Sequence, residues 1–288
     1  MKTLPILNSM LVLASGAGLS AQQANAQQKP HIILIMSDQH RADALGCMGN
    51  ESVISPNIDQ LSREGTLFCN GYSSTPSSTP ARAGLLTGMS PWHHGMLGYG
   101  RVAEEYKYEM PAMLTEQGYY TFGIGKMHWF PQKALHGFQG TLIDESGRAE
   151  SKDFISDYRL WLQLQMPGGD PDLTGIGWNE HRAGIYKLPE ELHPTAWTGK
   201  MACELIRNYD NEKPLFLKVS FARPHIRTIL PNGSWMNIRI KKFRHLIWGI
   251  GVTGMQPCLI RRKRIKTLHL PTLGRNMPGI PASTIMQM

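Results

Sequence analysis

The residues that point most directly to chemistry are a serine before a predicted helix and an arginine one turn further on. Ser78 and Pro80 lie at the end of a loop rich in Ser, Thr and Pro, and Arg82 opens an apolar segment that ends at Thr87-Gly88. An activated hydroxyl can attack an electrophile, while a helix N-terminus and an arginine both favour negative charge nearby. An ordinary N-capped helix would explain the Ser and Pro residues, but not the spacing to Arg82 and Thr87.

Polar residues also follow three predicted strands. Short, continuous apolar runs are typical of buried strands in a parallel sheet, and open α/β folds bind ligands at the carboxyl edge of the sheet. We therefore expect these polar residues to meet in one site. They are Asp38 and Gln39 after a strand at 31–36, Lys126 and His128 after a strand at 119–124, and His225 after a strand at 215–221.

The elements that must position these residues alternate between strands and helices. Apolar periodicity and start signals predict helices at 56–64, 81–86, 110–117, 152–165 and 195–208, and a further strand at 66–72. Repeated strand–loop–helix units indicate an α/β fold with a mostly parallel central sheet.

The segment from Ser78 to Gly88 resembles the signature of type I sulfatases, (C/S)-x-P-x-R followed by x-x-x-L-T-G, at every fixed position. Gly125-Lys126-x-His128 and the Arg-Pro-His triplet ending at His225 match further elements of that family. The resemblance runs from about residue 31 to residue 225. It implies the N-terminal part of an alkaline-phosphatase-like α/β sandwich.

The resemblance also implies roles for the individual residues. Ser78 would be oxidised by a formylglycine-generating maturase to an aldehyde, whose hydrate is the nucleophile, and Arg82 would hold that hydrate. Lys126 and His128 would contact the sulfate, and His225 would lie near the leaving-group oxygen. The substrate would be a sulfated small molecule or glycan. The implied ligands of one Ca²⁺ ion are Asp38, Gln39 and the hydroxyls derived from Ser78.

Two other functions fit parts of the sequence. A phosphatase or phosphonate hydrolase of the same superfamily would use an unmodified Ser or Thr, but the His/Asp ligands of its two zinc sites are not visible in the sequence. A non-catalytic secreted protein with a basic binding tail would explain the charge of the C-terminal region, and a real tail should show ordinary codon usage.

The first 26 residues predict export from the cytoplasm. Lys2 precedes a mostly apolar, small-residue run from 6 to 19, and Ala24-Asn25-Ala26 fits a signal-peptide cleavage site. The run is too short to anchor the chain in a bilayer. We expect a secreted or periplasmic protein cleaved after about Ala26, with no membrane partner.

The catalytic segment at 27–225 is followed by a region of different composition. Residues 226–288 contain 11 Lys and Arg and no Asp or Glu, so the net charge of +8 comes from this tail and gives little reason to expect nucleic-acid binding. In a shifted reading frame, residues 226–251 are compatible with an acidic, family-like sequence. We expect an aberrant, frameshifted tail, and an inactive chain that lacks the second half of the family domain.

Overall fold

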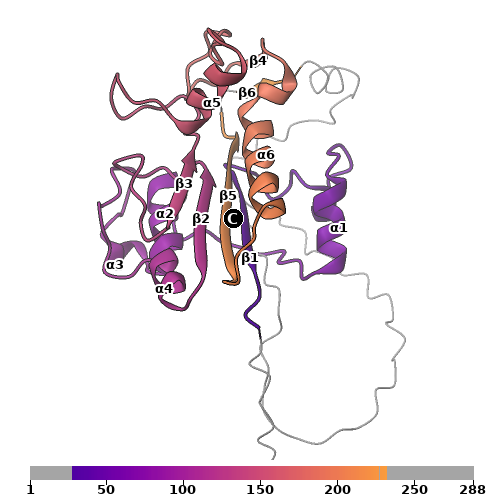
Figure 1. The fold of residues 1–288 in the computed structure, drawn as a ribbon. Coiled ribbons are helices and arrows are strands. Elements are labelled where there is room, and N and C mark those ends of the chain that lie inside the picture. Colours follow the sequence, from indigo (N-terminus) through magenta and orange to yellow (C-terminus); the bar gives the residue numbers. More distant parts are fainter. Residues whose placement is uncertain (1–27, 227, 232–288) are drawn as a thin grey trace, which may run out of the picture.

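The computed structural model describes residues 28–226 and 228–231 (Figure 1). The predicted signal peptide and the predicted tail beyond residue 231 lie outside the described residues. In the described part, no helix combines the length and the apolarity needed to cross a bilayer.

Strands and helices are mixed along the described part of the chain, but they do not alternate strictly. The strands are β1 (Ile32–Asp38), β2 (Tyr120–Gly125), β3 (Gly140–Ile143), β4 (Ala183–Ile185), β5 (Leu215–Pro224) and β6 (Thr228–Leu230). The α-helices are α1 (Pro56–Glu64), α2 (Ser78–Thr87), α3 (Pro91–His94), α4 (Met110–Glu116), α5 (Asp157–Gln165) and α6 (Pro194–Arg207), and two 3₁₀ turns lie at Gly46–Met48 and Glu190–Leu192.

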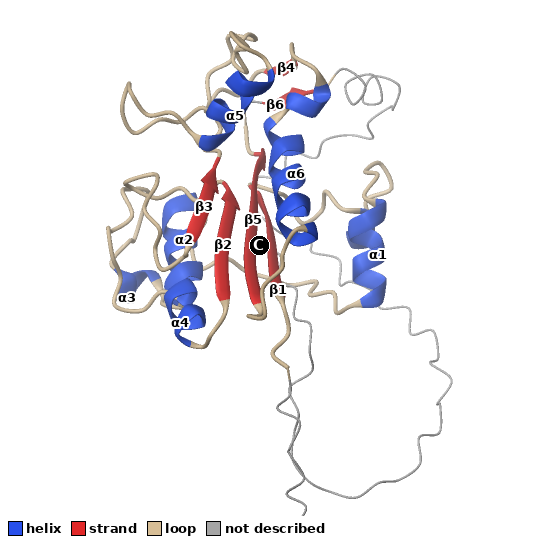
Figure 2. Ribbon diagram, viewed as in Figure 1, coloured by secondary structure: helices blue, strands red, loops and turns tan. Residues whose placement is uncertain are grey.

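The main sheet has the strand order β1-β5-β2-β3, and all of its described pairs are parallel (Figure 2). The three strands predicted at 31–36, 119–124 and 215–221 are therefore confirmed, and they are neighbours in the sheet. Because they run in the same direction, their carboxyl ends share one edge. The prediction of an α/β fold with a parallel sheet is also confirmed.

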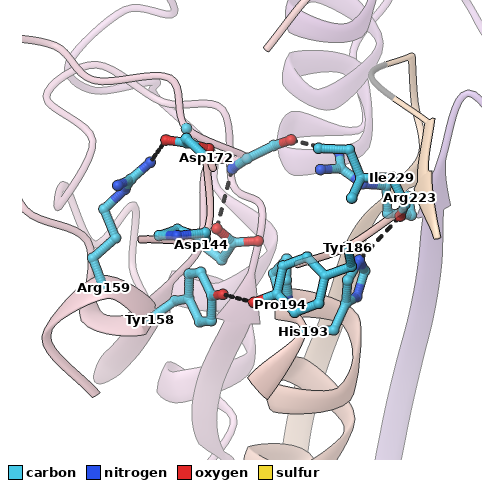
Figure 3. Close-up of a pocket in the computed structure, with 12 residues that line it drawn as sticks. Asp144, Tyr158, Arg159, Asp172, Tyr186, His193, Pro194, Arg223 and Ile229 are labelled. Carbon is cyan, nitrogen blue, oxygen red and sulfur yellow. Dashed lines mark hydrogen bonds and ion pairs between the residues drawn. The ribbon is translucent and has the colours of Figure 1, made fainter. Parts of the chain in front are cut away.

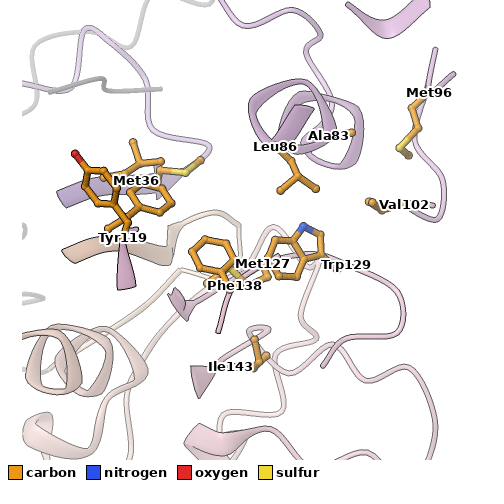
Figure 4. Packing of buried hydrophobic residues seen from close by; sticks show 12 residues of the cluster. Met36, Ala83, Leu86, Met96, Val102, Tyr119, Met127, Trp129, Phe138 and Ile143 are labelled. Carbon is orange, nitrogen blue, oxygen red and sulfur yellow. The ribbon is translucent and has the colours of Figure 1, made fainter. Parts of the chain in front are cut away.

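Helices cover both faces of this sheet. On one face, Ala83 and Leu86 of α2 pack in a cluster with Trp129, Phe138 and Phe216 (Figure 4). On the other face, Ala202 of α6 packs against Leu215, Leu217 and Val219 of β5. Phe216 and its neighbours Leu215 and Leu217 belong to different clusters, because successive side chains of a strand point to opposite faces of the sheet. Full burial of each large apolar side chain stabilises the fold by about 1.5–3 kcal/mol.

The predicted strand at 66–72 is wrong, because this segment is a loop. Its aromatic side chains are exposed, Phe68 by 64% and Tyr72 by 80%. A strand requires a partner, and β1 pairs only with β5 among the described strands. Ile33 and Ile35 of β1 are also partly exposed.

Candidate active site

Ser78 lies where α2 begins, beside the carboxyl ends of β2 and β5. Its Oγ lies 2.9 Å from Nδ1 of His128 and 3.1 Å from Nε of Arg82, which donates to it. Because Oγ accepts the hydrogen bond from Arg82, the hydroxyl proton of Ser78 is available to Nδ1 of His128. Ser78 itself is half-buried. Its hydroxyl therefore has both a possible base and a cation within hydrogen-bond reach.

The guanidinium of Arg82 ties the helix to two strand ends. Nη1 donates to the carbonyl oxygen of Lys126 at 2.6 Å and to Oγ of Ser220 at 3.0 Å, and Nη2 lies 3.5 Å from Oδ2 of Asp38. The residue is only 4% exposed. The planar fork of donors suits such simultaneous contacts, so Arg82 is fixed in place beneath the serine hydroxyl.

Asp38 and Lys126 form a close, buried ion pair. Burial alone would raise the pKa of Asp38, but the charges of Arg82 and Lys126 outweigh it and hold that pKa below its ordinary value. Burial lowers the pKa of Lys126, although the charge of Asp38 opposes this effect. The two cations share one carboxylate, so their immediate surroundings attract a further anion.

The backbone turn after β2 directs Lys126 and His128 toward Ser78. Gly125 has φ of +93°, and a Cβ there would lie 2.1 Å from the carbonyl oxygen of Ser220. His128 also has a positive φ, +64°, which is unfavourable for a residue with a Cβ. Only glycine fits at position 125, and other contacts must hold the turn at His128.

Glu145 supplies those contacts. Its Oε1 accepts from the backbone nitrogens of Met127 at 2.9 Å and His128 at 2.7 Å, and its Oε2 pairs with Arg148. The Glu145 side chain is fully buried. Sequence reasoning missed this role, because Glu145 belongs to no motif and lies 17 residues from His128.

We expect Glu145→Ala to lower the free energy of unfolding by about 2–5 kcal/mol, since two buried N–H groups and Arg148 lose their acceptor. Glu145→Gln should cost less, because its amide oxygen can still accept both backbone bonds. Urea unfolding of the 288-residue chain measures both values. An unchanged urea midpoint for Glu145→Ala would show that these contacts of Glu145, here called the Glu145 clamp, contribute nothing to stability.

His128 is kept neutral. Burial, followed by the charges of Arg148 and Lys126, lowers the pKa of His128 to about 2. The imidazole is therefore unprotonated at ordinary pH and can accept a proton. An anion bound beside Lys126 and Arg82 would compensate those charges and raise this pKa toward a more useful value.

His225 and Gln39 lie at the border of the site. The Nδ1 of His225 lies 3.2 Å from the carbonyl oxygen of Ile226, and burial followed by the charge of Lys126 lowers its pKa. Gln39 is exposed, and its Oε1 accepts from the backbone nitrogen of Ile226. The structure thus brings Asp38, Lys126, His128 and Arg82 together around Ser78, with Gln39 directed elsewhere.

The described residues do not form a calcium site by themselves. Ca²⁺ takes six to eight oxygen ligands. Of the three predicted ligands, Asp38 is paired with Lys126 and Arg82, Gln39 bonds to a backbone nitrogen, and the Ser78 hydroxyl faces His128. In the described part of the chain no group of three or more His, Cys, Asp or Glu residues could hold a metal ion.

A separate small cavity lies beyond the end of β3 (Figure 3). Its volume is about 20 Å³, room for about one water molecule. The hydroxyls of Tyr158 and Tyr186 lie 3.2 Å apart, and both donate to the carbonyl oxygen of Leu192. Burial raises the pKa of Asp144 in its wall. None of its described lining residues is a predicted site residue.

Comparison with known protein families shows which family the chain belongs to. The Sulfatase family model matches residues 30–232. The chain belongs to the sulfatase family. It is 38% identical over 210 residues to an arylsulfatase of Clostridium perfringens, a match that covers 68% of this chain and 44% of the relative. It is also 38% identical to an N-acetylgalactosamine-6-O-sulfatase of Bacteroides thetaiotaomicron, over 44% of this chain and 26% of the relative.

Solved structures agree with this family fold. A phosphonate monoester hydrolase of Agrobacterium radiobacter superposes with a TM-score of 0.58 at 23% identity, over 73% of this chain and 44% of that one. A structure solved with its substrate, D-glucosamine-2-N,6-O-disulfate, has a TM-score of 0.50 at 25% identity, over 69% of this chain and 35% of that one. The sulfatase chain described here therefore has the alkaline-phosphatase-like fold, but spans less than half the length of these relatives.

Proposed function

We propose that this chain carries the nucleophile-bearing part of a sulfuric ester hydrolase, in which Ser78 is matured to formylglycine. The observation that carries the proposal is the contact of one hydroxyl, Ser78 Oγ, with both His128 Nδ1 and Arg82 Nε, next to the buried cation of Lys126. This arrangement, within the family signature, suits attack on an anionic ester. The likeness to a phosphonate hydrolase is in the fold alone and supports no second activity.

The hydrated aldehyde would supply two hydroxyls on one carbon, one to attack sulfur and one whose deprotonation releases sulfate and restores the aldehyde. The residues around Ser78 fit this need. His128 lies where it can accept the released proton, since its Nδ1 is 2.9 Å from Oγ and its ring is neutral. In this proposal His128 acts as the general base.

The cations stabilise the charge that develops on the sulfuryl group. Arg82 is fixed by its bonds to Lys126 O and Ser220 Oγ and donates to the nucleophilic oxygen. Lys126 lies beside it and, with Asp38 as its only close anionic partner among the described residues, can also bind a sulfate oxygen. Such fixed donors need no reorganisation during the reaction. His225 would face the leaving-group oxygen.

We propose a sulfated glycan as the substrate class. Relatives named for N-acetylgalactosamine 6-O-sulfate and N-acetylglucosamine 6-O-sulfate, and a related structure with a sulfated glucosamine bound, support this choice. An aryl sulfate remains the alternative suggested by the Clostridium perfringens relative. We also propose that the protein is exported to the periplasm or beyond, where it would meet glycans outside the cytoplasm.

Calcium would require oxygen ligands beyond the described residues. We propose that these ligands come from the remaining part of the family domain, and that the 288-residue chain alone neither binds Ca²⁺ tightly nor turns over substrate. Below, the extended enzyme denotes this chain continued by that remaining part. Calorimetric titration of the 288-residue chain with Ca²⁺ tests the first point, and tight binding would contradict it.

Maturation can be tested on the 288-residue chain itself. After co-expression with an anaerobic radical maturase for Ser-type sulfatases, we expect the tryptic peptide of residues 64–82 to be lighter by two hydrogens, with fragment ions that place the loss at Ser78. The same peptide from Ser78→Ala should keep its unmodified mass. Unconverted Ser78, in cells that convert a known Ser-type sulfatase, would contradict the proposal.

A further inference from the structure

A cavity of about 330 Å³ opens directly beside the candidate nucleophile. Its wall includes Thr79 next to Ser78, and His128, whose Nδ1 bonds to Ser78. Tyr99, Arg101 and Arg148 also line the cavity. The volume falls within the range of about 300–1,000 Å³ typical of small-molecule sites. A group attached to a sulfate at Ser78 would therefore find room here.

Three nitrogens of residues in this wall make no hydrogen bond to another described residue. They are Nε2 of His128, Nε1 of Trp129 and Nε of Arg148, and all three are buried. Buried polar atoms are normally paired, so three unpaired nitrogens at one cavity indicate a place for oxygen atoms of a ligand. Nε of Arg148 is always a donor, and Nε2 of His128 is one when Nδ1 accepts from Ser78.

The wall also carries an available cation and an aromatic surface. The guanidinium of Arg101 lies over the ring of Phe130 at 4.0 Å, and Arg101 forms no ion pair with any described residue. Stacking occupies the flat face of a guanidinium and leaves its N–H edge free for bidentate contact with an anion. Tyr99 is 66% exposed and meets the His128 ring edge-on at 6.0 Å.

The acidic residue in the wall is accounted for. Glu150 is the only carboxylate among the described lining residues, and its Oε2 accepts from the backbone nitrogen of Gln132 at 2.5 Å. Arg148 is paired with Glu145, which balances its charge. The charge that the cavity prefers in a ligand therefore depends on Arg101, the cation without an acidic partner among the described residues.

We propose that this cavity binds the alcohol part of the sulfate ester, and that Arg101 selects a sugar with a second anionic group, a carboxylate or another sulfate. Tyr99 would contact the apolar face of the sugar ring, and His128 Nε2 and Arg148 Nε would bind ring oxygens or hydroxyls. The inference rests on the proposed function, because it takes the reacting sulfate to lie at Ser78. It adds a charge requirement that the family signature does not contain.

Calorimetric titration of the unmodified 288-residue chain tests this proposal. The probes are D-glucosamine 2-N,6-O-disulfate and N-acetyl-D-glucosamine 6-O-sulfate, which differ in the second anion. We expect the disulfate to bind about tenfold more tightly, and Arg101→Ala to remove this difference, because charge-assisted hydrogen bonds to a guanidinium are strong. Arg63→Ala, an exposed arginine on α1, is the matched control and should leave both affinities unchanged.

A second pair of variants tests the aromatic contact independently. Tyr99→Ala should weaken both sugars to a similar degree, while Tyr99→Phe should bind as the wild type does. Equal affinities for the two sugars, unaffected by Arg101→Ala, would overturn the inference and leave the sulfatase proposal intact. Absence of binding by either sugar would also overturn it, whereas the sulfatase proposal itself is decided separately by conversion of Ser78 to the aldehyde.

Discussion

In the matured extended enzyme, Ser78→Ala should reduce sulfate ester hydrolysis by about 10⁴-fold or more. Alanine has no oxygen to be oxidised, so neither the aldehyde nor its two hydroxyls can form, and water would have to attack sulfur directly. The cations Arg82 and Lys126 would remain, and sulfate ester binding should therefore persist. The expected result is a loss in kcat with a much smaller change in KM, measured on an aryl sulfate reporter.

Ser77→Ala is the matched control for this prediction. Ser77 is the N-cap residue of α2, directly before the nucleophile, and its side chain makes no capping hydrogen bond. Its loss should therefore change neither the start of the helix nor the turnover. Near-normal activity of Ser78→Ala would refute the assignment of the nucleophile. A large loss in Ser77→Ala would mean that the loop geometry, and not the Ser78 oxygen, determines the rate.

Much of the site could be predicted because it lies at strand ends. The runs that became β1, β2 and β5 are continuous and apolar, so their period and their polar endings could be recognised in the sequence alone. Adjacent parallel strands then bring Asp38, Lys126 and His225 to one edge without any knowledge of side-chain contacts. The helix at 56–64 was equally clear, since Pro56 marks its first turn.

The rest depends on contacts that no local pattern encodes. The Glu145 clamp joins Glu145 to the backbone nitrogens of Met127 and His128, which lie 18 and 17 positions earlier in the chain. The pairing of Asp38 with Lys126 depends on how β1 and β2 flank β5, and the sequence of either strand alone does not show this arrangement. The loop at 66–72 had strand-like composition, but strand formation depends on a partner, which local composition does not specify.

The second large effect is expected at Lys126 and His128, the two buried residues that we propose contact the sulfate. In the extended enzyme, Lys126→Ala and His128→Ala should each lower kcat by about 10²–10⁴-fold, since one removes a fixed charge and the other the proton acceptor. Both side chains are buried, so circular dichroism must first show that each variant is folded. Lys133→Ala, an exposed lysine later in the same loop that pairs with Asp157, is the matched control.

The pH dependence of kcat/KM distinguishes the roles of Lys126 and His128, because the charge of Lys126 also lowers the pKa of His128. If His128 is the base, as proposed, turnover requires its neutral form, so the rate falls when the pH drops below the pKa of that imidazole. Burial and the charges of Arg148 and Lys126 lower this pKa to about 2, which places the acid limb of kcat/KM below the usual range of assay. Removal of the Lys126 charge raises the pKa, so the acid limb of Lys126→Ala should move to higher pH. In Lys126→Gln, which also lacks the charge but keeps a polar side chain, the limb should move equally. If neither variant shows an acid limb at higher pH than the wild type within the range of the assay, the role of His128 as the base is contradicted, even if turnover has fallen.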